Sequence, residues 1–243
     1  AEIDWSVGQI LDTLDQHDLA EHTMVIFTSD NGPWLSYGDH AGSARPLREG
    51  KGTMFDGGCR EPAVMWWPGK IPAGTVCKEP AMTIDILPTL ADMVDAGVEF
   101  GDIDGGSFKN LVYQETNEVS RPHPFILFHD KSARAKSSSK PADSETALMR
   151  GDYKLIKTWR DGKQHTMELY DLAKDPGEAN DLAKEMPELA AELDETVVGA
   201  DQQQRLVVHG GQHLTHQFVH ALIDMAQVAR EAQVRLLVLR VRL

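Results

Sequence analysis

The chain has 243 residues, which is enough for one large domain or two smaller ones. Its formal net charge of −14 excludes nucleic acid and anionic membrane surfaces as expected partners, because both would repel it. No apolar run is long enough to span a membrane. The two cysteines, Cys59 and Cys77, are too few for a disulfide scaffold and lack the CxxC spacing of metal sites; they are compatible with one disulfide or with two buried free thiols.

The first hundred residues alternate helix and strand patterns. Residues 3–18 predict an amphipathic helix, and residues 24–28 predict a short apolar strand. Residues 32–60 are rich in glycine and charge and predict a long loop, followed by a second apolar strand over residues 63–67 and a helix over residues 83–96. This alternation predicts an α/β domain with a mainly parallel sheet. The apolar face of the first helix consists of Ile3, Val7, Ile10, Leu11 and Leu14. Thr83 or Asp85 is expected to cap the last helix, and Gly97 to end it.

Composition changes near residue 115, and the pattern after it differs. Residues 131–145 are polar and predict a surface loop. Two short strand-like runs, Tyr153–Thr158 and Met167–Tyr170, surround an Asp-Gly turn and predict an antiparallel hairpin. Residues 186–197 predict the helix that closes this smaller α+β subdomain.

The last segment, residues 200–243, has an unusual composition, rich in His and Arg. Its histidines are spaced for one helix face, which leaves three interpretations open. They could form a zinc site, they could belong to an ordinary amphipathic helix, or the segment could result from a shifted reading frame. These histidines are His209, His213, His216 and His220.

The first strand runs straight into an acid, an amide and a Gly-Pro turn. Asp30 and Asn31 would place hard oxygen ligands, suited to Ca²⁺ or Mg²⁺, at the carboxyl end of a buried strand. The alternative is an ordinary turn, since Asp, Asn, Gly and Pro all favour turns.

The glycine-rich loop after this turn carries three cations, Arg45, Arg48 and Lys51. Glycine lets the backbone approach a ligand closely, and cations hold an anion. A P-loop is excluded, because Gly52 rather than Ser or Thr follows the lysine. A solvated basic loop is the alternative for this segment taken alone. Together with the acidic turn, it predicts a metal-assisted site for a sulfate or phosphate group.

Three segments, VIFTSDNGP, PLREGKGTMFDGGCREPAVMWWPGKIPAG and TIDILPTLADMVDAG, resemble the formylglycine-dependent, arylsulfatase-like sulfatases of the alkaline phosphatase superfamily in order and spacing. ALMRGDYKLI and LYDLAKDPGEANDLA resemble the C-terminal subdomain of that family. The resemblance covers roughly residues 1–199. It implies the C-terminal part of an alkaline-phosphatase-like, mainly parallel sheet sandwiched by helices over residues 1–115. A small antiparallel α+β subdomain would follow over residues 116–199, and the tail of residues 200–243 lies outside the resemblance.

The resemblance also implies roles for particular residues. Asp30 and Asn31 would ligate Ca²⁺, or Mg²⁺ in its place, and Lys51 would be the catalytic and substrate-binding residue that contacts the sulfate and its bridging oxygen. Glu49 stands where the family has glycine, which is a departure. Cys59, in GGCREP, stands where relatives usually carry an aliphatic residue and is interpreted as a packing residue.

The resemblance implies a nucleophile that this sequence does not contain. No Cys-x-Pro-x-Arg or Ser-x-Pro-x-Arg motif occurs in the chain, so formylglycine is expected in a missing N-terminal segment. The implied activity is sulfate ester hydrolysis on a sulfated small molecule or glycan, in a periplasmic, secreted or lysosomal protein. We expect this chain alone to be inactive. Two alternatives stay open: a phosphonate or phosphate monoester hydrolase of the same superfamily, and a non-catalytic remnant or binding protein. Trp34, Tyr37, His40 and Trp159 are candidates for sugar or aryl contacts, with ordinary loop packing as the alternative.

Overall fold

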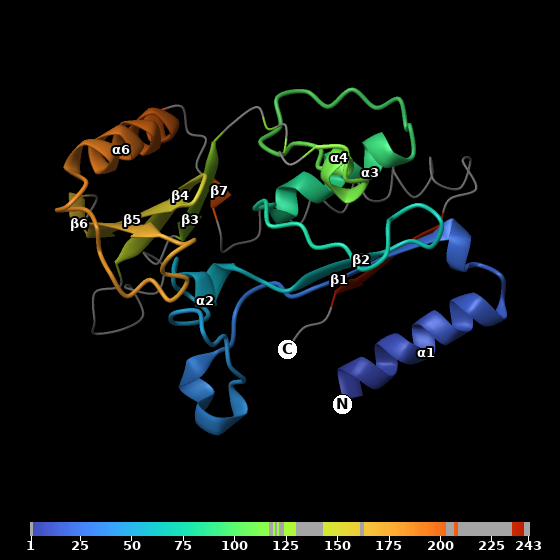
Figure 1. Ribbon diagram of the computed structural model, residues 1–243. Coiled ribbons are helices and arrows are strands. Elements are labelled where there is room, and N and C mark those ends of the chain that lie inside the picture. Colours follow the sequence, from blue (N-terminus) through green and yellow to red (C-terminus); the bar gives the residue numbers. More distant parts are fainter. Residues whose placement is uncertain are drawn as a thin grey trace. The chain divides into compact units, whose positions relative to one another are not determined.

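The computed structural model describes residues 2–116, 119, 121, 124–129, 143–160, 163–202, 207–208 and 235–240. They form two compact units (Figure 1). The first unit comprises Ala1–Ser29, Pro62–Pro122 and His213–Leu243, and the second comprises Asp30–Glu61 and His123–Gln212. The domain bounds predicted from the sequence (residues 1–115, 116–199 and 200–243) rest on the family resemblance and stay a prediction. Within the described ranges, no helix combines the length and apolar character that crossing a membrane requires.

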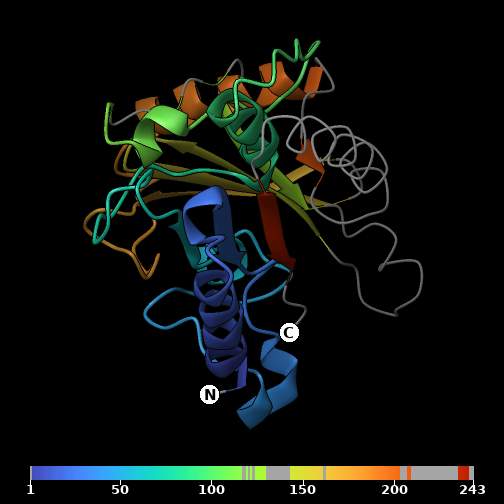
Figure 2. The same ribbon diagram turned by 90° about the vertical axis from the view of Figure 1, so that its right-hand side faces the viewer.

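The first unit contains a three-stranded sheet in the order β2-β1-β8. The central strand β1 (Thr23–Thr28) pairs antiparallel with β2 (Ala63–Trp66) and parallel with β8 (Arg235–Arg240), which lies beside it in Figure 2. Both strands predicted from sequence are therefore confirmed, and one of the two described pairings is parallel. The predicted first helix is also confirmed as α1 (Glu2–Gln16), but its apolar residues are only half-buried.

The core of the first unit lies between β1 and the helix that the sequence predicts after residue 83. That helix comprises a 3-10 turn, η3 (Thr83–Asp85), followed by α3 (Ile86–Met93). Trp67, directly after β2, is buried and donates its indole N–H to the Glu21 carbonyl at 2.8 Å. Burying each large apolar side chain contributes roughly 1.5–3 kcal/mol, which is how this core stabilises the unit. Its buried residues are Met24, Ile26, Trp67, Leu90 and Ala91, and the remaining short helices of this unit are η1 (Ala20–His22) and α4 (Lys109–Val112).

Asp85 is the residue at the N-cap position of α3, but its side chain forms no capping hydrogen bond to that helix. Its fully buried carboxylate accepts the backbone N–H of Met82 at 2.7 Å and that of Gly106 at 2.9 Å. It also forms an ion pair with Arg121 at 2.5 Å. A buried carboxylate is tolerated only with such partners, so Asp85 ties the helix start to the chain segments around it.

The second unit contains a five-stranded sheet in the order β6-β5-β4-β3-β7. The pairings from β3 to β6 are antiparallel, and β7 pairs parallel with β3. The predicted hairpin is confirmed as β5 and β6, and the predicted closing helix is confirmed as α6 (Pro187–Gln202). The strands are β3 (Phe125–His129), β4 (Ser144–Arg150), β5 (Tyr153–Arg160), β6 (Lys163–Asp171) and β7 (Val207–Val208).

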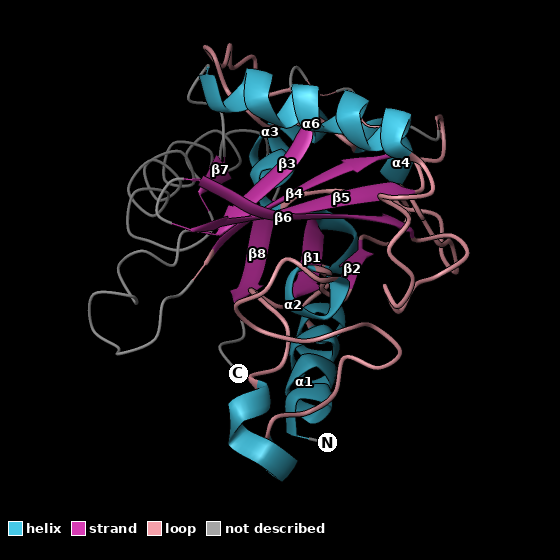
Figure 3. Cartoon of the chain, turned by 90° about the vertical axis from the view of Figure 1, so that its left-hand side faces the viewer, coloured by secondary structure: helices cyan, strands magenta, loops and turns pink. Residues whose placement is uncertain are grey.

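Helix α6 covers one face of this sheet (Figure 3). Alternate residues of a strand point to opposite faces, so the α6 side of β5 receives Leu155 while the other side receives Lys154. Both residues are completely buried, which means that each face of β5 is covered. The apolar cluster under α6 includes Leu148, Leu155, Leu169, Leu193 and Val197.

Candidate functional site

The turn after β1 and the glycine-rich loop are joined backbone to backbone within the second unit. In the acidic turn, defined here as residues 30–33, Gly32 donates its N–H to the Gly58 carbonyl at 3.2 Å. Lys51 donates its backbone N–H to the Pro33 carbonyl at 3.0 Å. The structure therefore brings together the segments that carry the predicted metal ligands and the predicted sulfate-binding lysine, although Lys51 follows Asn31 by 20 positions in the sequence.

Glycines make this close approach geometrically feasible. A Cβ on Gly32 would lie 1.8 Å from the Gly57 carbonyl oxygen, and one on Gly57 would lie 2.3 Å from the Arg48 carbonyl oxygen. A Cβ on Gly58 would lie 2.4 Å from the Gly50 carbonyl oxygen. Any side chain at these positions would push the neighbouring backbone segments apart, so the glycines fix how near Lys51 can come to the acidic turn.

Asp30 of the acidic turn lies close enough to Glu61 for their charges to interact. Asn31 donates from Nδ2 to Asp30 Oδ1 at 3.1 Å, and Asp30 is exposed. Desolvation, and after it the charge of Asp30, raises the pKa of Glu61 to about 7. The Oε1 atom of Glu61 is buried and has no hydrogen-bond partner among the described residues. Two carboxylates that repel each other beside an amide are a donor set suited to a hard cation.

This donor set is incomplete as a metal site. In the part of the chain that the structure describes, no three His, Cys, Asp or Glu side chains gather to hold a metal by themselves. The four histidines of the predicted zinc site lie outside the described residues, so that interpretation stays a prediction.

A buried charge cluster, consisting of Lys154, Asp56 and Glu178, holds the glycine-rich loop against the five-stranded sheet. Lys154 Nζ lies 2.6 Å from Asp56 Oδ1 and 2.9 Å from Glu178 Oε1, and the side chains are at most 2% exposed. The contact with Asp56 is an aligned hydrogen bond, whereas the contact with Glu178 Oε1 lacks that alignment and acts as a charge interaction. Asp56 also donates its backbone N–H to Glu178 Oε2 at 2.7 Å.

The protonation state of Lys154 depends on its burial and on its acidic neighbours. Burial alone would lower the pKa of Lys154, but its acidic neighbours, Asp56 and Glu178 among them, raise that pKa above its ordinary value. The lysine therefore stays charged and can hold Asp56. Sequence reasoning missed this cluster, although a lysine inside the apolar run YKLI was a signal that a buried partner was needed.

Arg48 adds a second attachment of the loop to the sheet. Its Nη1 donates to the Glu178 carbonyl at 2.7 Å and to the Tyr170 hydroxyl at 3.1 Å, and its guanidinium lies 3.9 Å from the centre of the Phe55 ring. The sequence pattern groups Arg48 with Lys51 as a cation for holding an anion. These contacts make it a structural residue instead.

The two cysteines are free thiols, so a Cys59–Cys77 disulfide is excluded. Cys77 is exposed rather than buried, while Cys59 is half-buried with its sulfur 3.8 Å from Lys154 Nζ. Desolvation raises the pKa of Cys59 to about 11 against the opposing effect of Lys154. Cys59 therefore stays protonated at neutral pH, which suits a packing residue rather than a nucleophile.

Comparison with known proteins decides the family. The family model described as the C-terminal region of N-sulphoglucosamine sulphohydrolase matches residues 50–203, and the sulfatase model matches residues 1–96. The chain belongs to the sulfatase family. The resemblance noted in the sequence is thereby confirmed. The part of the glycine-rich loop from residue 50 to residue 60 lies inside both matched regions.

Individual sulfatases match over parts of their length. The chain is 32% identical to arylsulfatase A of Homo sapiens over 190 residues, which cover 74% of this chain and 37% of that protein. It is 49% identical to N-acetylgalactosamine-6-sulfatase of Canis lupus familiaris over 89 residues, or 36% of this chain and 17% of that protein. The match to N-acetylgalactosamine-6-O-sulfatase of Bacteroides thetaiotaomicron is 30% over 217 residues and covers 80% of this chain. The aligned part is at most 39% of the length of these three relatives.

Solved structures confirm the α/β fold class of the sulfatases. A Bacteroides thetaiotaomicron protein described for the metabolism of multiple glycosaminoglycans superposes with a TM-score of 0.61 at 26% identity, covering 82% of this chain and 43% of that chain. A complex with D-glucosamine-2-N,6-O-disulfate superposes with a TM-score of 0.65 at 24% identity, covering 83% of this chain and 38% of that chain.

Replacing Lys154 by Met should strongly destabilise the second unit, because the buried carboxyl groups of Asp56 and Glu178 would lose their cationic partner. We expect a loss of about 3–5 kcal/mol in the free energy of unfolding, measured by urea denaturation. Lys174→Met is the matched control, because Lys174 forms its ion pair with Asp171 at the surface, where it is 82% exposed. Equal midpoints for the two variants would contradict the role given to the cluster.

Glu49 should be strained, since its φ of +60° lies in the left-handed region that favours glycine. Glycine, which the resemblance implies at this position, would adopt this conformation without strain. We expect Glu49→Gly to be more stable than Glu49→Ala by about 1 kcal/mol in thermal or urea unfolding. Both variants remove the same charge, so the difference reports the backbone alone. Alanine equal to or better than glycine would show that Glu49 carries no such strain.

Proposed function

We propose that this chain supplies the metal-binding turn and the sulfate-binding lysine of an enzyme that hydrolyses sulfate esters. The observation that supports the proposal is the backbone bond from Lys51 to Pro33, which joins the segment of the lysine to the turn that carries Asp30 and Asn31. Membership of the sulfatase family gives this arrangement its chemical meaning.

Asp30 and Asn31 would hold Ca²⁺ through a carboxylate and a carboxamide oxygen, and Glu61 lies close enough to feel the charge of Asp30. The bound ion would neutralise charge on the sulfate oxygens. Lys51 would bind the sulfate by charge and stabilise the negative charge that develops on the bridging oxygen as the ester breaks. Ca²⁺ takes six to eight oxygen ligands, so these residues would form one part of its coordination shell.

No residue of this chain is assigned as the nucleophile. A Cys-x-Pro-x-Arg or Ser-x-Pro-x-Arg motif does not occur in its sequence, and Cys59 lies in GGCREP with a thiol that stays protonated. Cys59 therefore does not fit a formylglycine precursor, and the contribution proposed for this chain is binding and charge stabilisation.

The substrate class proposed is a sulfated small molecule or glycan. Matches to two N-acetylgalactosamine 6-sulfatases and to arylsulfatase A support this class. A periplasmic, secreted or lysosomal location is proposed on the family resemblance alone.

Titration calorimetry with the purified chain tests the proposal. Asp30→Ala should weaken Ca²⁺ binding about tenfold or more, because a charged ligand is lost. Lys51→Ala should keep Ca²⁺ binding and lose binding of inorganic sulfate. Asp12→Ala removes an exposed carboxylate of α1 and serves as the matched control. Ca²⁺ binding that is unaffected in Asp30→Ala, or sulfate binding that is unaffected in Lys51→Ala, would overturn the assignment.

A further inference from the structure

We propose that Trp34 and Tyr37 form an aromatic platform that binds the ring of a sulfated pyranose while Lys51 holds its sulfate group. This inference deepens the proposed function and rests on it. It assigns a substrate-recognition role to residues directly after the acidic turn.

The two rings are exposed although they are among the largest apolar groups of the second unit. Trp34 is 41% exposed and Tyr37 is 59% exposed, with ring centroids 4.5 Å apart and a tilt of 38°. Leu35 between them is 46% exposed. The two rings pack on each other, and the exposed part of each remains accessible to a ligand. Contiguous exposed apolar side chains mark a surface that binds something.

The platform is held in place by the same backbone contacts that position the lysine. Tyr37 donates its backbone N–H to the Trp34 carbonyl at 3.0 Å, within the start of η2 (Leu35–His40). Gly50 packs so closely that a Cβ on it would lie 2.9 Å from Leu35 Cγ. The rings are therefore presented by a braced segment, which lowers the entropy cost of binding a ligand.

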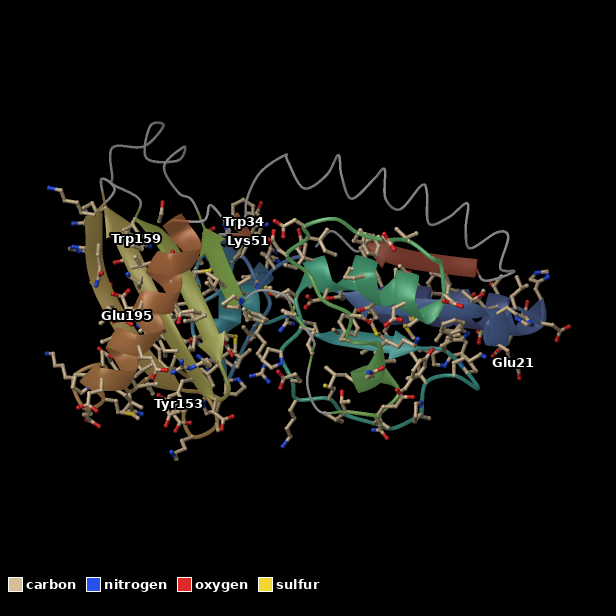
Figure 4. The ribbon with its side chains drawn as sticks, turned by 90° about the horizontal axis from the view of Figure 1, so that it is seen from above. Glu21, Trp34, Lys51, Tyr153, Trp159 and Glu195 are labelled. Carbon is tan, nitrogen blue, oxygen red and sulfur yellow. The ribbon has the colours of Figure 1, made fainter. Side chains whose placement is uncertain are left out.

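Lys51 lies directly beside the platform. Its Nζ atom is 5.5 Å from the centre of the Trp34 ring, and Figure 4 shows the two side chains next to each other. A ring that rests on Trp34 would bring a sulfate on its edge within reach of this ammonium group. The distance is also within the range of a cation–π contact, which keeps the lysine near the ring before an anion binds.

A pyranose fits this surface better than an aryl group. The C–H face of a sugar is apolar and can pack on an aromatic face, while its hydroxyl groups need polar partners at the rim. The segment that carries the platform supplies such partners, because Ser36, Asp39 and His40 are all exposed within η2. An aryl sulfate would use the rings and leave these groups without a role.

Titration calorimetry with the full chain and four probes tests this inference. The probes are galactose 6-sulfate, galactose, inorganic sulfate and 4-nitrophenyl sulfate. We expect Trp34→Ala and Tyr37→Ala each to weaken binding of galactose 6-sulfate about tenfold, and to leave binding of inorganic sulfate unchanged. Trp5→Ala removes a tryptophan that is 66% exposed on α1, and it should change the binding of neither galactose 6-sulfate nor inorganic sulfate. Thermal unfolding is measured for all three variants and should be unchanged in Tyr37→Ala and Trp5→Ala, whose rings are more than half exposed, while Trp34→Ala should stay folded at the temperature of the titration.

The outcomes separate this inference from the proposed function. If sulfate binding depends on Lys51 but galactose 6-sulfate binds no better than sulfate, the platform is wrong and the proposed function stands. If Trp34→Ala also loses inorganic sulfate, Trp34 only positions Lys51 and the platform is overturned. If 4-nitrophenyl sulfate binds more tightly than inorganic sulfate by the same factor as galactose 6-sulfate does, the choice of a pyranose is overturned. Sulfate binding that survives Lys51→Ala would overturn the proposed function itself.

Discussion

The ion pair between Lys154 and Asp56 is the constraint on which the second unit depends. Taking an ammonium and a carboxylate out of water costs several kcal/mol each, so neither is stable there without the other. Lys154 lies on a strand of the sheet, and Asp56 lies in the glycine-rich loop at the start of the one-turn helix α2 (Asp56–Cys59). Their contact at 2.6 Å therefore locks the loop to the sheet, and Glu178 completes the cluster.

The loop that is held in this way lies against the acidic turn and carries Lys51. Its glycines let it approach the acidic turn closely enough for the Lys51 N–H to bond to the Pro33 carbonyl, which joins the segment of the proposed sulfate-binding lysine to that of the proposed calcium ligands. The same contacts brace the segment that carries Trp34 and Tyr37. One buried cluster thus supports the segments to which three roles are proposed: metal binding by the acidic turn, anion binding by Lys51 and ring binding by Trp34 and Tyr37. This explains how an exposed loop can present groups at fixed positions.

Local patterns predicted much of this chain. The helix periodicity of α1 and α6 and the apolar runs of β1 and β5 gave the right elements, because each depends on residues close in sequence. The family motifs pointed to Asp30, Asn31 and Lys51, and the structure brings their segments together, while their roles stay proposals. The buried cluster could not be predicted, because Lys154 and Asp56 are far apart along the chain and only the fold unites them. The positive φ of Glu49 could not be predicted for a similar reason, since its backbone follows from the surrounding loop.

Hydrogen exchange at the Lys51 amide reports whether the buried cluster holds the loop, because this N–H bonds to the Pro33 carbonyl only if the loop is held in place. We expect the amides of Lys51 and Gly57 to be protected in the unaltered chain and to lose protection in Lys154→Met. The amide of Ala190 in α6, bonded to Met186, should keep more of its protection than either. If Lys51 and Gly57 exchange equally slowly in both proteins, the buried cluster does not position the lysine and the account is wrong.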